Sequence, residues 1–182
     1  FTINFFRNKT QKWSGDFATI FKGKDAEQQT QILDAYALWR ENGSNRLDLT
    51  DDIRPYALRL NNYFNKISAY QSGAKPNFNE RSNYFPHSFD AEKLKDEGNA
   101  GRLVELLRAK HPEMYPTDED AFNAVIKLRA GLDANLQNPD PGGMSASADQ
   151  ARVWTNITYN DMRNANVAHD PVSSVYKYIR EA

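Results

Sequence analysis

Cysteine is absent from the sequence. Its absence excludes disulfide bonds and thiolate metal sites, and it fits a reducing compartment. Long apolar runs are missing as well: no stretch resembles a signal peptide, and none approaches the ~20 apolar residues that a membrane-spanning helix needs. With 182 residues, of which 40% are hydrophobic and 26% are charged, the chain is long enough to bury a core without covalent staples.

Patterns typical of catalysis are also scarce. The three histidines, His87, His111 and His169, do not have metal-ligand spacing. No glycine-rich phosphate loop and no serine in a nucleophile elbow is present. Runs of carboxylates at 51–52 and 118–120 each open a predicted helix, where free backbone N–H groups account for them; a general acid–base pair is the alternative. The sequence therefore predicts no metal, no cofactor and no enzymatic activity.

The formal net charge is −1, but the charges are unevenly distributed. The first 24 residues carry a single acidic side chain, and their basic side chains are Arg7, Lys9, Lys12, Lys22 and Lys24. Aromatic residues lie between these basic positions, so the segment is a candidate for weak nucleic-acid contact through phosphates and bases. A solvated basic face over an apolar stripe is the favoured alternative, because dedicated nucleic-acid domains usually have a larger basic excess.

Apolar residues recur at helical spacing along most of the chain. Residues 1–5 instead alternate apolar and polar, as an extended segment does. Helices are expected over residues 10–21, 26–42, 51–71, 90–97, 100–110 and 117–132, with a closing helix that Asp170 caps and Pro171 begins. The predicted fold class is all-α: an irregular bundle of about six helices, with a long aromatic-rich loop at 74–89 and a small C-terminal element.

The predicted organisation has three parts. Residues 1–134 form a helical core module, residues 135–150 form a mobile linker or loop rich in proline and glycine, and residues 151–182 form a C-terminal helical element. This last element either packs back on the module or reaches to a neighbouring molecule. Because the chain begins with phenylalanine, we expect it to be a segment of a longer polypeptide; a mature form trimmed by a protease is the alternative.

The predicted loop before residue 90 is too apolar to be free in solvent. We expect Tyr84, Phe85 and Phe89 to anchor it on the helix over residues 51–71, with Pro86 stiffening it. The alternative is a ligand pocket lined by a wider set of rings, Tyr63, Phe64, Tyr70, Tyr84 and Phe85. Aromatic residues at helical spacing belong more often to a core, so the anchoring role is favoured.

A family resemblance rests on this loop and on the end of the chain. Residues 81–90 read Arg-Ser-Asn-Tyr-Phe-Pro-His-Ser-Phe-Asp, which resembles the Asn-Tyr-Phe-Pro-Arg turn of large bacteriophage polyvalent or internal virion (ejection) proteins. Residues 152–182 are similar to the end of those modules, which read Arg-x-Leu-Thr-x-Ile, then Asn-Asp-Pro, then Tyr-x-Arg. The resemblance spans residues 50–182. The chain departs from it at His87, where the family has arginine, and in its acidic insertion at 135–150.

The resemblance implies a structural module of a bacteriophage virion protein of the internal or ejection class. Such a module acts in particle assembly or genome delivery through contacts with other virion proteins, in a homo-oligomeric assembly. It is made in the bacterial host cytoplasm and is located in the virion. One alternative is an accessory, non-catalytic domain of a virion-borne enzyme, an RNA polymerase or a lytic transglycosylase polyprotein, with weak nucleic-acid contact. Another is a host-directed binding module that uses residues 135–150.

Overall fold

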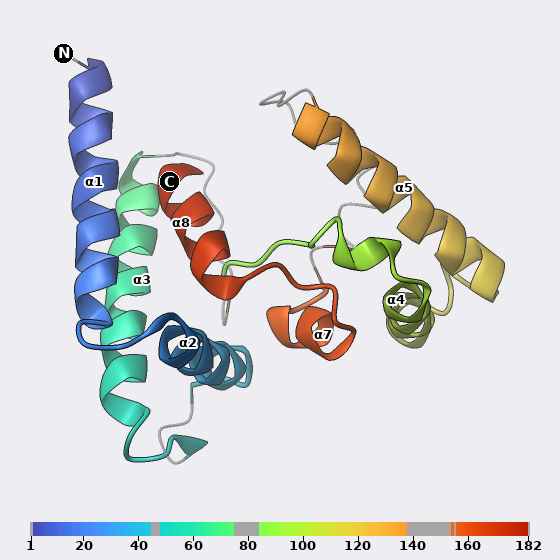
Figure 1. The fold of residues 1–182 in the computed structure, drawn as a ribbon, viewed down its shortest axis with the longest axis horizontal. Coiled ribbons are helices and arrows are strands. Elements are labelled where there is room, and N and C mark those ends of the chain that lie inside the picture. Colours follow the sequence, from blue (N-terminus) through green and yellow to red (C-terminus); the bar gives the residue numbers. More distant parts are fainter. Residues whose placement is uncertain (1, 45–47, 75–83, 138–153, 155, 182) are drawn as a thin grey trace. The chain divides into compact units, whose positions relative to one another are not determined.

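The computed structural model describes residues 2–44, 48–74, 84–137, 154 and 156–181. Within these residues the predicted all-α fold class is confirmed (Figure 1). The α-helices are α1 Thr2–Ile20, α2 Ala26–Glu41, α3 Arg54–Ala74, α4 Glu97–Lys110, α5 Asp118–Gln137, α7 Tyr159–Asn164 and α8 Pro171–Glu181, and a 3₁₀ turn, η2, spans Lys93–Lys95. No described helix combines the length and the apolar character that crossing a bilayer requires.

The chain forms two compact units. Unit 1 consists of Phe1–Pro86 and Asp170–Ala182, and unit 2 consists of His87–His169. Unit 2 is thus inserted between two segments of unit 1. This division differs from the expected one, because the expected C-terminal element contributes α7 to unit 2 and α8 to unit 1. Composition marks proline-rich and glycine-rich segments, but it does not reveal where the chain returns to an earlier unit.

Unit 1 packs helices around an aromatic and aliphatic core. Helices α1 and α3 run side by side in opposite directions, and α8 contacts α1 and α2 (Figure 1). Successive turns of α3 bury Leu60, Phe64 and Ile67 on one face, which is the helical spacing read from the sequence. Asp25 caps α2 by accepting a hydrogen bond from the Gln28 backbone N–H, and the Gln28 side chain completes a capping box.

Unit 2 is built on the pair α4 and α5, which contact each other along their apolar faces. Leu103 and Leu107 of α4 and Val125 of α5 are buried, as is Met162 of the short helix α7. A capping box at Thr158 starts α7. Helices of six residues are marginal alone, so this cap and the burial of Met162 account for α7.

The first helix is longer than predicted. It begins at Thr2, whereas the sequence predicts an extended segment over residues 1–5 and a helix from Thr10, so that prediction is wrong. No glycine or proline interrupts residues 2–10. Once a helix has formed, each added residue contributes one hydrogen bond at little cost, and this cooperativity outweighs a short alternating pattern.

The helix break predicted at Gly98 is also wrong. Asp96 caps α4 by accepting a hydrogen bond from the Asn99 backbone N–H, so α4 includes Gly98 in its first turn. Backbone N–H groups in a first turn need no partner within the helix, so glycine there does not end it. A Cβ on Gly98 would lie only 3.1 Å from the Asp96 carboxylate, which gives a local reason for glycine beside this cap. The segment before it forms η2 in place of the predicted short helix.

The expected linker at 135–150 falls largely outside the described residues. Helix α5 continues through Gln137, so the first residues of the expected linker are helical. Residues 138–150 lie outside the described part of the chain.

Candidate functional site

The anchoring residues predicted from the sequence meet the aromatic core of unit 1. We define the aromatic cluster as the rings linked to Phe85 through successive ring–ring contacts. They come from α1 and the residue after it, from α2, α3 and α8, and from the segment before unit 2: Phe17, Phe21, Tyr36, Trp39, Tyr63, Phe64, Tyr84, Phe85, Tyr176 and Tyr178. The cluster therefore joins four helices that are distant in sequence.

Phe85 is the member of the cluster that comes from the segment before unit 2 and is fully buried. Its side chain has 0% exposure. Its ring meets Tyr36 of α2 at 5.9 Å and Phe64 of α3 at 6.2 Å between ring centroids, both with edge-to-face geometry. Aromatic pairs in this geometry are favourable beyond the area that they bury. Phe85 thus connects the segment that leaves unit 1 to two of its helices.

Polar groups in the cluster have structural partners. The Tyr63 hydroxyl donates to the Trp13 carbonyl oxygen at 2.8 Å, and the Tyr178 hydroxyl donates to the Gln71 side-chain oxygen at 3.0 Å. The guanidinium of Arg40 donates to the Asn61 side-chain oxygen. The Tyr63 bond connects α3 to α1, and the Tyr178 bond connects α8 to α3.

Burial also favours the neutral form of two phenols in the cluster. It raises the pKa of Tyr36 and of Tyr63 well above the ordinary tyrosine value. A neutral phenol that donates to a fixed partner is not poised to act as a base. The chemistry of the cluster is therefore cohesion between helices.

The four predicted anchors do not share one place. Phe85 and Pro86 are buried, and Phe85 contacts α3 as expected. The Tyr84 ring meets Tyr178 of α8, at 6.4 Å between centroids. Phe89 belongs to unit 2, where its ring contacts Trp154 at 5.5 Å. The packing on residues 51–71 expected for all three rings is seen for Phe85, and for Tyr84 and Phe89 it stays a prediction.

Of the five basic residues considered for nucleic-acid contact, the four with described side chains do not form one cationic surface. The Arg7 side chain lies outside the described part of the chain. The ammonium of Lys9 lies over the rings of Trp13 and Tyr70, and burial lowers the pKa of Lys9, so this charge is directed to aromatic faces.

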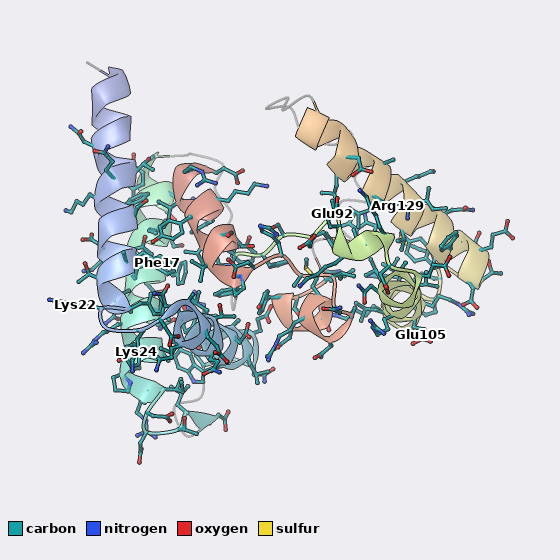
Figure 2. The ribbon with its side chains drawn as sticks, in the orientation of Figure 1. Phe17, Lys22, Lys24, Glu92, Glu105 and Arg129 are labelled. Carbon is teal, nitrogen blue, oxygen red and sulfur yellow. The ribbon has the colours of Figure 1, made fainter. Side chains whose placement is uncertain are left out.

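The other three basic residues lie further along or beyond α1. Lys12 is exposed on the helix, and Lys22 is exposed just past its end, near Lys24 (Figure 2). The Lys24 ammonium lies 5.4 Å from the Tyr56 ring centroid. Lys12 lies about 12 Å of helix rise before the end of α1, so Lys12 and Lys22 do not act as one cluster.

Sequence reasoning missed the pairing of the two ends of unit 2. Phe89 and Ala168 form an antiparallel bridge. The Asp90 backbone N–H donates to the Val167 carbonyl at 2.8 Å, and the His169 backbone N–H donates to the Ser88 carbonyl at 2.9 Å. The apolar residues Phe89 and Ala168 at the two ends of unit 2 were the only hint in the sequence. They are too far apart in sequence for a local pattern to connect them.

Asp90 organises this pairing. Its carboxylate accepts hydrogen bonds from the backbone N–H groups of Glu92 and Lys93 at 3.0 and 3.2 Å, and it lies 3.6 Å from His169 Nδ1. Partial burial opposes ionisation, but these backbone N–H groups together with His169 outweigh it and lower the pKa of the Asp90 carboxyl.

Asp90→Asn is expected to lower the stability of unit 2 at neutral pH. A carboxyl with a lowered folded-state pKa contributes stability that is present above the unfolded pKa, about 3.9, and is lost as the pH falls through the folded value. Asparagine keeps an acceptor oxygen and removes only the charge. The difference in unfolding free energy between wild type and variant should therefore shrink below about pH 4.

Urea titrations of the two proteins between neutral and acidic pH provide the measurement. Asp48→Asn is the matched control, because Asp48 is exposed and makes no ion pair among the described residues. Parallel pH profiles for wild type and Asp90→Asn would contradict the role of the Asp90 charge.

Groups that could perform chemistry do not converge in the described part of the chain. Among those residues, no set of three or more histidine, cysteine, aspartate or glutamate side chains is arranged to hold a metal ion. The carboxylates at 51 and 118 make ion pairs with Arg54 and Arg108. The three histidines lie apart in sequence, and two of them approach single carboxylates, Glu113 and Asp90. The arrangement supports packing and capping roles for these residues.

Comparisons with known proteins find no match: no family model, no curated protein and no solved structure corresponds to this chain.

Proposed function

We propose that this chain is a structural helical module of a bacteriophage virion protein of the internal or ejection class. It acts in particle assembly or genome delivery through contacts with other virion proteins. It is made in the host cytoplasm and resides in the particle. It has no catalytic role and needs no cofactor.

The observation that carries the proposal is the position of Phe85. Residues 83–87 carry the motif that resembles the phage proteins, and Phe85 of this motif is fully buried, with its ring against α2 and α3. A motif residue that serves catalysis or ligand binding needs access to its substrate. A motif residue that closes a core serves the fold, which favours a structural role for the module that carries it.

A second line of support is the use of polar groups. The tyrosine hydroxyls of the aromatic cluster and the carboxylate of Asp90 bind backbone or amide partners at structural positions. Enzyme sites usually bring several perturbed ionisable groups together in one cleft. The perturbed groups here, such as Tyr36 and Asp90, are distributed over both units.

The content of purified particles tests the proposal. Phage particles from a host that carries the coding sequence are banded on a density gradient, and peptides of this chain are quantified by mass spectrometry relative to the major head protein. We expect a constant ratio across the particle band. Peptides confined to the soluble lysate, with none in the band, would overturn the proposal.

A further inference from the structure

The outward face of α5 carries apolar side chains that unit 2 leaves uncovered. Phe122 is 47% exposed and Ile126 is 38% exposed, while Ala121, Val125 and Leu128, on the adjacent face of the helix, are buried. Residues four apart lie on one helix face, so Phe122 and Ile126 are neighbours and form one small apolar patch. Exposed aromatic and branched aliphatic side chains placed together indicate a contact surface.

This apolar patch belongs to a longer row of side chains with a charged residue at each end. Glu119, Phe122, Ile126 and Arg129 are separated by three, four and three residues, which is the spacing of a and d positions in a coiled coil. The row is acidic at Glu119, which is exposed near the start of α5, and basic further along at Arg129, which is half-buried. Glu119 and Arg129 lie about 15 Å apart along the helix, too far to pair with each other, and neither makes an ion pair among the described residues.

We propose that this row binds a second copy of the same chain, whose α5 packs antiparallel across it. The inference rests on the proposed function, which acts through protein contacts, and deepens it by naming a partner and a surface. A second copy is the partner that the order of charges on the row favours. When one copy is turned end to end, its acidic end meets the basic end of the other copy.

The register of the pair follows from two-fold symmetry. An axis midway between Phe122 and Ile126 places each Phe122 against Ile126 of the second copy. The same operation places each Glu119 against Arg129 of the second copy, so both ends of the row gain an opposite-charge layer. A parallel pair would set Glu119 against Glu119 and Arg129 against Arg129. The charges thus favour the antiparallel, self-complementary arrangement.

The interface is small, and the association is weak for that reason. Stable interfaces bury about 1,200–2,000 Å² in total, and one pair of 20-residue helices reaches the lower part of this range at best. We expect dimers at concentrations above roughly 10–100 µM. Inside a particle the copies are concentrated and aligned, so many weak contacts of this kind act together and hold the copies in place.

Sedimentation equilibrium of the full 182-residue chain over this concentration range tests the proposal. Glu119→Arg sets like charges against Arg129 at both ends of the row, and Arg129→Glu does the same against Glu119. Each single variant is expected to raise the dimer dissociation constant about tenfold or more. An equimolar mixture of the two single variants restores association, because every layer again holds opposite charges. The double variant Glu119→Arg/Arg129→Glu also dimerises.

Lys127→Glu is the matched control. Lys127 is exposed on α5 but lies outside the row, so this reversal of charge leaves the dimer intact. Circular dichroism of each variant checks that the helices are retained, and recovery of the dimer on mixing shows that the single variants are folded. A monomer up to about 1 mM, or single variants that associate like wild type, overturns the inference.

The dimer and the proposed function can fail separately. If the chain is found in particles but stays monomeric and shows no recovery on charge swapping, only the proposed α5 contact is refuted. A chain that dimerises as described but is missing from particles removes the virion role and leaves the contact.

Discussion

Replacing Phe85 with alanine is expected to lower the free energy of unfolding of unit 1 by about 3–5 kcal/mol. The side chain is fully buried, and its ring touches Tyr36 and Phe64 in edge-to-face geometry. Alanine leaves a cavity where three segments meet, and backbone atoms on several elements would have to move to fill it. Such rearrangement is only partial in packed cores. The expected loss of unfolding free energy is therefore near the upper end of the range seen for single substitutions.

Urea denaturation followed by circular dichroism measures this effect, at a concentration where the chain is a monomer. Phe122→Ala is the matched control, because it removes the same side chain from an exposed site. Surface substitutions of this kind change stability by about 0.5 kcal/mol or less. Equal stability of wild type and Phe85→Ala would show that the segment is not seated in the core.

Leu107→Ala is expected to destabilise unit 2 by about 2–5 kcal/mol. Leu107 has 0% exposure and lies on α4, the helix that packs on α5. The loss combines the transfer of the removed methyl groups with the cost of the cavity left between the helices. Because α4 and α5 pack against each other in the core of unit 2, the effect concerns the whole unit.

Trp154 provides a probe for this change. It is the tryptophan within unit 2, and its ring contacts Phe89, so its fluorescence follows unfolding of that unit when Trp13 and Trp39 are replaced by phenylalanine. Met114→Ala is the control, since Met114 is 37% exposed in unit 2. Similar losses for Leu107→Ala and Met114→Ala would mean that burial of Leu107 does not govern the stability of unit 2.

Local patterns in the sequence account for the helices and for much of the core. Helix α3 could be predicted because Leu60, Phe64 and Ile67 recur at the spacing that one buried face requires. The cap at Asp25 could be predicted because its side chain acts within one turn. These features depend on residues a few positions apart.

Features that depend on distant residues could not be read in the same way. The pairing of Phe89 with Ala168 joins the two ends of unit 2 across the whole unit, and no local signal connects them. The position of Tyr84 against Tyr178 likewise depends on the return of the chain into unit 1 after residue 169. The burial of Phe85 was predictable from its apolar setting, while its second neighbour, Tyr36 on α2, was not.

Protease protection in purified particles tests most directly whether this chain works as a packed internal component. Intact, genome-filled particles and particles emptied by triggered genome release are treated with the same protease, and the surviving amount of the chain is measured by immunoblot. We predict that the chain survives in filled particles and is lost from emptied ones. A chain that is digested equally in both, or that is absent from filled particles, would contradict this role.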